Sequence, residues 1–249
     1  MDHPEPARGH ERRHLGPARA DHRPPHRRLR RPRRTGRRAH RHRAGLLRGR
    51  RSARRARAGR ERVPGDVSRT IRLGAQRLIA AVLDCEKPVI AAVNGTAAGI
   101  GAHLAFACDL VLAADTAKFI EVFVRRGLVP DGGGAYLLPR LVGPQRAKEL
   151  MFFGDALSAA DAERMGLVNR TVPERELTAL AAAWAGRLAA GPTRAVALAK
   201  QLVNASLDGD RAAAFAAEAA AQEINMTTRD ADEGVAAFVE RRTPEYRGH

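Results

Sequence analysis

Residues 88–134 constrain this chain most, because two glycine-rich turns there each lead from an extended segment into a helical one. Residues 89–93 form an apolar, β-branched run of strand length, and a helix is predicted over 102–107. The glycine-rich turn 96–101 lies between them. Such a turn lets backbone N–H groups point outward at the positive end of a helix dipole, where an anion or a developing oxyanion is stabilised. We therefore treat this turn as a candidate oxyanion site.

A second glycine cluster at 132–134 follows Asp131 and precedes a predicted helix over 135–141. Two interpretations of Asp131 remain open. Spacing alone favours a helix N-cap, and the alternative is a carboxylate near the oxyanion site. The turn is a poor match to the dinucleotide-binding fingerprint, because Gly99-Ile-Gly101 lacks the third glycine.

The positive charge of the chain is confined to one end. Residues 1–62 hold 23 of the 44 Lys and Arg residues and 5 of the 27 Asp and Glu residues, so they carry +18 and the remainder carries −1. This segment is rich in Pro, Gly and Ala and is predicted to be disordered. Because it has no Phe, Tyr or Trp to stack on bases, a nucleic-acid arm is the least favoured function, and no nucleic-acid partner is expected.

Several motifs resemble the crotonase superfamily, the enoyl-CoA hydratases and isomerases. Their order and spacing match from 88 to 173, and more loosely to 238: KPVIAAVNG (87–95), ACDL (107–110), AKF (117–119), GLVP (127–130), LPRLVG (138–143), SAAD (158–161), GLV (166–168) and EGVAAF (233–238). The resemblance implies an α/β crotonase-like fold, a superhelix of strand–strand–helix turns. We expect a core at 63–173 and a helical oligomerisation region at 174–249 that forms trimers or hexamers.

The family pattern is missing from the head of the chain. Crotonases carry an Ala-Phe-Cys-Ala-Gly-Ala-Asp-like segment that supplies the first oxyanion N–H, and residues 45–51 here read GLLRGRR. Permitted codons for those seven residues, shifted by one base, encode Ala-Phe-Cys-Ala-Gly-Ala followed by Asp or Glu. We therefore hypothesise that residues 1–62 are a coding region read out of frame, with the family frame regained between about 57 and 66. Sequencing the gene across this region tests the hypothesis.

The resemblance also assigns site residues. It implies that the backbone N–H of Ile100 is the second oxyanion donor and that Asp131 shuttles a proton between carbons, as in several isomerases of the family. The two glutamates of family hydratases match His103 and Phe123, and since Phe cannot transfer a proton, isomerisation is slightly favoured over hydration. A lone His on an apolar helix is more often structural. Seven substrate-binding residues are implied: Ala98, Gly99, Gly101, His103, Phe119, Phe123 and Gly132.

The predicted function is therefore an acyl-CoA-processing enzyme of this family, with coenzyme A as part of the substrate and with no cofactor or metal. The alternative is an acyl-CoA-binding or oligomerising homologue, impaired because the first oxyanion donor is missing. Cys85 and Cys108, the only cysteines, lack metal-ligand spacing and indicate a reduced, cytoplasmic protein. No apolar run reaches the length of a membrane span, so no membrane partner is expected.

Overall fold

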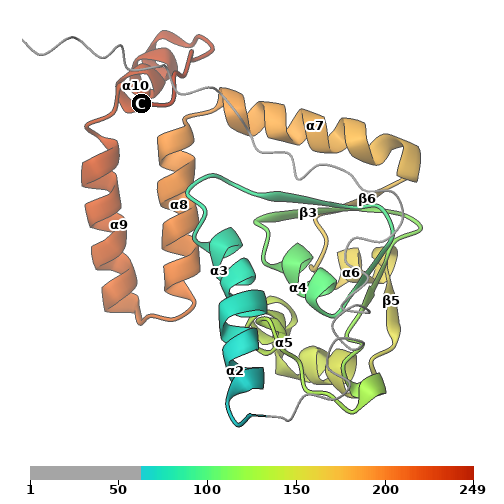
Figure 1. Ribbon diagram of the computed structural model, residues 1–249. Coiled ribbons are helices and arrows are strands. Elements are labelled where there is room, and N and C mark those ends of the chain that lie inside the picture. The colour runs from blue at the N-terminus through green and yellow to red at the C-terminus, as the bar shows by residue number, and fades with distance from the viewer. Residues whose placement is uncertain (1–62) are drawn as a thin grey trace, which may run out of the picture. The chain divides into compact units, whose positions relative to one another are not determined.

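The computed structural model describes residues 63–249 (Figure 1), so the predictions for residues 1–62 lie outside the described part. One continuous helical segment comes first, made of α2 (Asp66–Ile71), the π-helical turn η1 (Arg72–Gln76) and α3 (Arg77–Leu83). It ends at Leu83, four residues before Lys87, the residue whose helical geometry Pro88 disfavours. The segment buries Ala75 and Ile79 and leaves most of its other side chains exposed.

The first sheet is parallel and has the strand order β1 (Ile90–Val93), β3 (Leu110–Ala114), β6 (Arg170–Val172). Ile90 lies beside Leu110, and Leu112 lies beside Arg170. Residues 111–114 of β3 are all buried, as expected for the central strand of a parallel sheet. Helix α7 (Glu174–Ala190) packs against β1 and β3.

The second sheet has the order β2 (Thr96–Ala98), β4 (Lys118–Ile120), β5 (Ala156–Ser158), with β2 parallel to β4 and β5 antiparallel to it. Two turns of chain share one pattern. In the first, β1 and β2 are followed by α4 (Ile100–Phe106), and in the second, β3 and β4 are followed by the short 3₁₀ helix η2 (Val124–Arg126) and by α5 (Gly134–Phe153). The leading strands of the two turns pair in one sheet and the second strands pair in the other. The predicted α/β fold of strand–strand–helix turns is confirmed.

Helix α5 is longer than the predicted segment 135–141 and is broken once, at Gly143, whose φ of 78° and ψ of 161° are not helical. Pro144 follows at once and begins the second half of α5. After β5, Ser158 caps α6 (Ala159–Arg164) by accepting a hydrogen bond from the Asp161 N–H at 3.1 Å. The Ser158 hydroxyl also donates to Asp161 Oδ2 at 2.5 Å, so Ser158 supplies the N-cap half of a capping box.

The chain beyond residue 173 is helical, as predicted. After α7 come α8 (Thr193–Ser206), α9 (Arg211–Asn225) and α10 (Arg229–Glu240). Asp210 and Thr228 cap α9 and α10 with their side chains. Figure 1 shows α8 and α9 side by side, and they contact each other. Within residues 63–249, no helix combines the length and the apolar composition needed to cross a bilayer.

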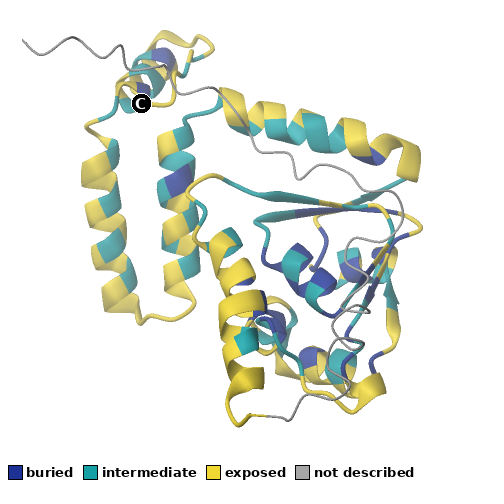
Figure 2. Ribbon diagram, viewed as in Figure 1, coloured by how far each residue is buried: buried dark blue, intermediate teal, exposed yellow. Residues whose placement is uncertain are grey.

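The largest buried cluster surrounds α4 and β3, where dark blue is concentrated in Figure 2. Ala102, Leu112 and Leu138 are fully buried in it. Helix α9, in contrast, buries no residue, and Figure 2 shows it without dark blue. The core therefore supports the segment 96–134 that carries the candidate site residues.

Candidate active site

The first turn of α4 is set by Gly99. Its φ of 55° and ψ of −121° lie in a region that L-residues rarely adopt, and a Cβ there would lie 3.4 Å from ring atoms of Phe123. The Gly99 N–H donates to the carbonyl of Ile120 at 2.9 Å, which fixes the turn against β4. Ile100 is then the first residue of α4, and the first N–H groups of a helix have no partner within it. This is the geometry expected for a backbone donor at Ile100.

Asp131 begins a turn that we call the Asp131 turn, residues 131–133. Gly132 and Gly133 both have positive φ, 80° and 89°, and α5 begins only at Gly134 with Gly133 as its N-cap. No side chain caps α5. The interpretation of Asp131 as a helix N-cap is therefore wrong, because the two left-handed glycines move the helix start beyond its reach.

The Asp131 turn packs against the first turn of α4. A Cβ on Gly132 would lie 3.5 Å from Cγ1 of Ile100 and 3.7 Å from Nδ1 of His103. The structure thus brings together Ile100, His103 and the residue that follows Asp131. Asp131 itself is half-buried, and its Oδ1 is fully shielded from solvent.

His103 forms a buried pair with Glu121, which the sequence offers as a possible second carboxylate of uncertain exposure. The two side chains are 0% and 4% exposed, and His103 Nε2 lies 2.9 Å from Glu121 Oε2. The imidazole also stacks on Phe123 with ring centroids 5.3 Å apart and an interplanar angle of 15°. One signal was available: Glu121 alternates with Phe119 and Phe123, which are both buried, so it lies on the same face.

The His103 ring is also held from the side of α5. A Cβ on Gly134 would lie 2.5 Å from Cε1 and 2.8 Å from Cδ2 of His103, and closer still to Nε2. Real Cβ atoms essentially never approach so closely, so any side chain at position 134 would displace the imidazole. Three elements, α4, α5 and the segment after β4, therefore fix one ring.

Unsatisfied polar atoms gather around this ring. Among residues 63–249, three buried side-chain atoms lack a hydrogen-bond partner, and they are His103 Nδ1, Glu121 Oε1 and Asp131 Oδ1. Native proteins contain few such atoms, since each costs about 1–3 kcal/mol. Two of them belong to the His103–Glu121 pair, and the third belongs to the residue before Gly132, which packs on His103. This grouping indicates a site prepared for a polar group from outside the described residues.

The remaining predicted site residues, Ala98, Gly101 and Phe119, belong to β2, α4 and β4. Ala98 is the last residue of β2 and pairs with Ile120, and Gly101 is buried in α4. Phe119 is 2% exposed and stacks on Phe106 at 5.3 Å between ring centroids, in the hydrophobic core. No described contact joins Phe119 to the Asp131 turn.

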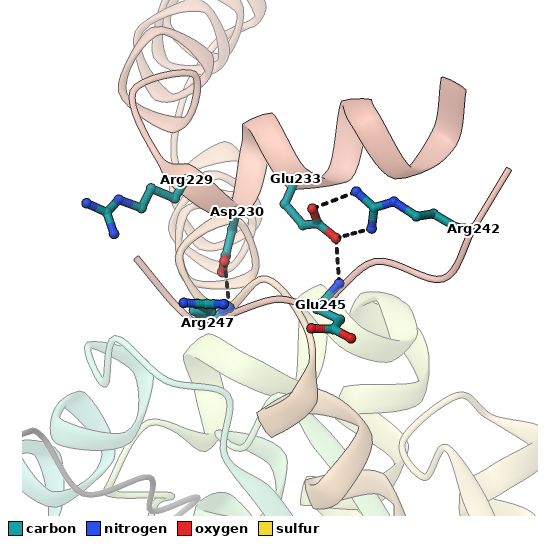
Figure 3. A pocket seen from close by; sticks show the side chains of 6 residues that line it. All are labelled: Arg229, Asp230, Glu233, Arg242, Glu245 and Arg247. Carbon is teal, nitrogen blue, oxygen red and sulfur yellow. Dashed lines mark hydrogen bonds and ion pairs between the residues drawn. The ribbon is translucent and has the colours of Figure 1, made fainter. Parts of the chain in front are cut away.

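A second concave region lies at the C-terminus and is lined by Arg229, Asp230, Glu233, Arg242, Glu245 and Arg247 (Figure 3). The two oxygens of Glu233 accept bonds from Arg242 at 2.6 and 2.9 Å. The pairing with Arg242 lowers the pKa of Glu233 to about 2. Buried Asp230 accepts from the backbone N–H groups of Arg247 and Gly248, each at 2.7 Å. The bonds made by Glu233 and Asp230 therefore hold the C-terminal segment against α10.

Comparison with known proteins relates this geometry to one family. The family model for enoyl-CoA hydratase/isomerase matches residues 59–249. The match begins inside the interval 57–66, where the sequence predicted that the family pattern resumes. Residues 45–51, where the first oxyanion donor was expected, lie outside it.

Curated relatives include both kinds of activity. A probable enoyl-CoA hydratase from Rhodobacter capsulatus is 43% identical over 171 residues, which is 69% of this chain and 66% of that protein. A crotonyl-CoA hydratase from Syntrophomonas wolfei is 43% identical, and the match covers 68% of this chain and 64% of that protein. A 1,2-epoxyphenylacetyl-CoA isomerase from Escherichia coli is 41% identical, and the match covers 65% of this chain and 62% of that protein. The chain therefore spans just under two thirds of the length of these relatives.

Solved structures give the same result for the fold. A putative enoyl-CoA hydratase from Streptomyces coelicolor A3(2) superposes with a TM-score of 0.73 at 40% identity, covering 76% of this chain and 69% of the other. An enoyl-CoA hydratase/isomerase from Cupriavidus metallidurans CH34 superposes with a TM-score of 0.72, also at 40% identity, covering 75% and 70%. The fold of residues 63–249 is thus that of these proteins.

Proposed function

The chain belongs to the enoyl-CoA hydratase/isomerase family, and on that premise we propose that it acts on an acyl-CoA thioester, with Asp131 moving the proton. The N–H of Ile100 donates to the thioester carbonyl oxygen as charge develops there. Asp131 takes a proton from one carbon, the C–H electron pair passes into the thioester enolate, and the protonated carboxyl returns the proton to another carbon. Coenzyme A enters as part of the substrate, and no further cofactor is required.

One observation supports this proposal most. Gly132, the residue after Asp131, packs on the side chain of Ile100, so the carboxylate and the candidate oxyanion donor belong to adjoining turns. The Oδ1 atom of Asp131 is buried and has no partner among the described residues. A carboxylate that is neither a helix cap nor part of a described ion pair is available to exchange a proton with a bound substrate.

Isomerisation is favoured over hydration by the residue at position 123. Paired-carboxylate hydration needs a second acid, and Phe123 occupies the position that matches one of the two family glutamates. A proton shift between carbons needs one base, which Asp131 supplies. The relatives support both outcomes, because two are named hydratases and one is named an isomerase.

An acyl-CoA-binding protein without turnover is the second candidate. The family match starts at residue 59 and leaves out residues 45–51, where the first oxyanion donor was expected. Removing one oxyanion donor typically costs about 10²–10³ in kcat. Retention of acyl-CoA without any turnover would favour this candidate.

Self-association through the C-terminal helices is part of the proposal. Helices α9 and α10 expose large apolar side chains, among them Phe215 at 62%, Phe238 at 84% and Val239 at 73%. Exposed apolar patches of this kind often mark protein–protein contacts. We expect a trimer or hexamer, and light scattering coupled to size-exclusion chromatography measures it.

Replacing the proposed base tests the function. The Asp131→Asn variant should lose about 10²–10⁴ in turnover of 3-enoyl-CoA and 2-enoyl-CoA esters while it still binds acyl-CoA, because the amide keeps the shape but accepts no proton. Asp155→Asn is the matched control, since Asp155 is 87% exposed and its ion pair within residues 63–249 is with exposed Arg125 at 3.5 Å. Normal activity of Asp131→Asn would refute the proposed role.

A further inference from the structure

We propose that Glu121 is a positioning residue that fixes one tautomer of His103, leaving the Nδ1 atom of His103 as a second proton acceptor beside the Asp131 turn. This inference rests on the proposed function, because it adds a second proton-handling group to the same site. His103 lies on α4 and Glu121 directly follows β4, so the two side chains are 18 positions apart in the sequence.

The tautomer follows from the partner of Nε2. A carboxylate oxygen only accepts hydrogen bonds, and Glu121 Oε2 lies 2.9 Å from Nε2, so the proton of a neutral imidazole belongs on Nε2. The lone pair is then on Nδ1. Carboxylates beside catalytic histidines set the tautomer of the ring and stabilise the imidazolium that forms. Glu121 has this role beside His103.

The direction of Nδ1 is set by packing. It is the ring atom nearest to the Cβ that Gly132 lacks, at 3.7 Å, so it faces the Asp131 turn. Stacking on Phe123 and the close approach of Gly134 prevent the ring from turning away. A fully buried nitrogen that is fixed in this direction and has no partner among residues 63–249 is the atom expected to meet a substrate or a water molecule.

The charges around His103 are few. Glu121 contacts the ring, and Asp131 lies one residue before Gly132. On the other packed elements, Arg72 and Arg77 of the first helical segment are exposed, and Arg140 of α5 is engaged by Asp208 at 2.9 Å. Among the described residues, Glu121 is the only one that forms an ion pair with the imidazole.

The proton balance is simple. Nδ1 accepts a proton and the ring becomes an imidazolium that faces the Glu121 carboxylate. The ring later returns the proton to the substrate or to water, so none is consumed over a turnover. Proton transfer by a positioned side chain of this kind contributes typically 10²–10⁴-fold to rate.

A spectroscopic experiment tests the tautomer without depending on turnover. In full-length protein labelled with ¹⁵N-histidine, the His103 signals are identified by their loss in His103→Gln. We expect Nε2 to carry the proton, and butanoyl-CoA, which is saturated and cannot isomerise, to shift the Nδ1 signal. A proton on Nδ1 in the free protein, or an Nδ1 signal unchanged by bound butanoyl-CoA, would overturn the inference.

Kinetics test the positioning role. Glu121→Gln should lower kcat/KM at least about tenfold with little change in KM. It should also move the acidic limb of the pH profile to lower pH, because the imidazolium loses the carboxylate that stabilises it. Glu121→Asp should restore part of the rate. Glu149→Gln, at an exposed Glu that pairs with Arg146, is the matched control and should match the wild type.

The outcomes separate the two proposals. Absence of acyl-CoA binding would refute the proposed function and this inference with it. Turnover that depends on Asp131, together with superimposable pH profiles for Glu121→Gln and the wild type, would refute the inference alone and leave the pair a purely structural one.

Discussion

Gly134→Ala should destabilise the protein although alanine is a better helix former than glycine. The added Cβ would lie 2.5 Å from Cε1 and 2.8 Å from Cδ2 of His103, and this ring is fully buried with Phe123 stacked on it. The substitution therefore displaces the imidazole and breaks its 2.9 Å contact with Glu121.

The magnitude follows from three contributions. Overpacking a core costs about 1–3 kcal/mol. Leaving the buried Glu121 oxygen without its partner costs about 1–3 kcal/mol. Alanine returns up to about 1 kcal/mol of helix propensity, and the backbone of Gly134 is not left-handed, so no strain is added. The expected net loss is about 1–5 kcal/mol, which corresponds to a fall in Tm of about 2–20 °C for a chain of this size.

Urea unfolding followed by the fluorescence of Trp184, the only tryptophan, measures the loss. Gly186→Ala is the matched control, because Gly186 lies exposed within α7 and a Cβ there would meet nothing within 4 Å. It should gain about 0.5–1 kcal/mol. In a His103→Ala background, Gly134→Ala should cost little, since the clash is gone. A Gly134→Ala protein as stable as the wild type, with the control behaving as expected, would refute the reasoning.

Two further predictions concern groups away from the site. Lys200→Met should lower the free energy of unfolding by about 2–4 kcal/mol, because it leaves the Asp109 carboxylate without its cationic partner. Lys200 Nζ lies 2.9 Å from Asp109, and the two side chains are 6% and 21% exposed. Arg146→Met, which breaks an exposed pair with Glu149, should change the free energy of unfolding by at most about 0.5 kcal/mol in the same urea titration. Burial raises the pKa of the Cys108 thiol to about 12, with the Asp109 charge adding to the rise. At pH 9 only about one thiol in a thousand is then ionised, so iodoacetamide should label Cys108 slowly until urea unfolds the chain. Because the folded state holds the proton, the stability that this thiol contributes is complete below about pH 9 and is lost as the pH rises towards 12. Equal labelling of native and unfolded protein would contradict the assignment.

The sequence by itself determined the features that depend on neighbouring residues. The strand before the first glycine turn, the Ser158 cap of α6 and the helix start after Pro173 each follow from the conformational limits of a few consecutive residues. The order of the family motifs likewise indicated the fold and the family. These predictions succeeded because turn, cap and proline signals act within one or two helical turns.

Tertiary structure alone decided which polar groups meet. Asp131 looked like a helix cap until two left-handed glycines placed the start of α5 at Gly134. His103 looked like an isolated histidine on an apolar helix, and only the packing of α4 against the exit of β4 gave it Glu121 as a partner. The physical reason is that burial removes water as an alternative partner, so the importance of a polar side chain depends on segments distant in sequence that fold around it.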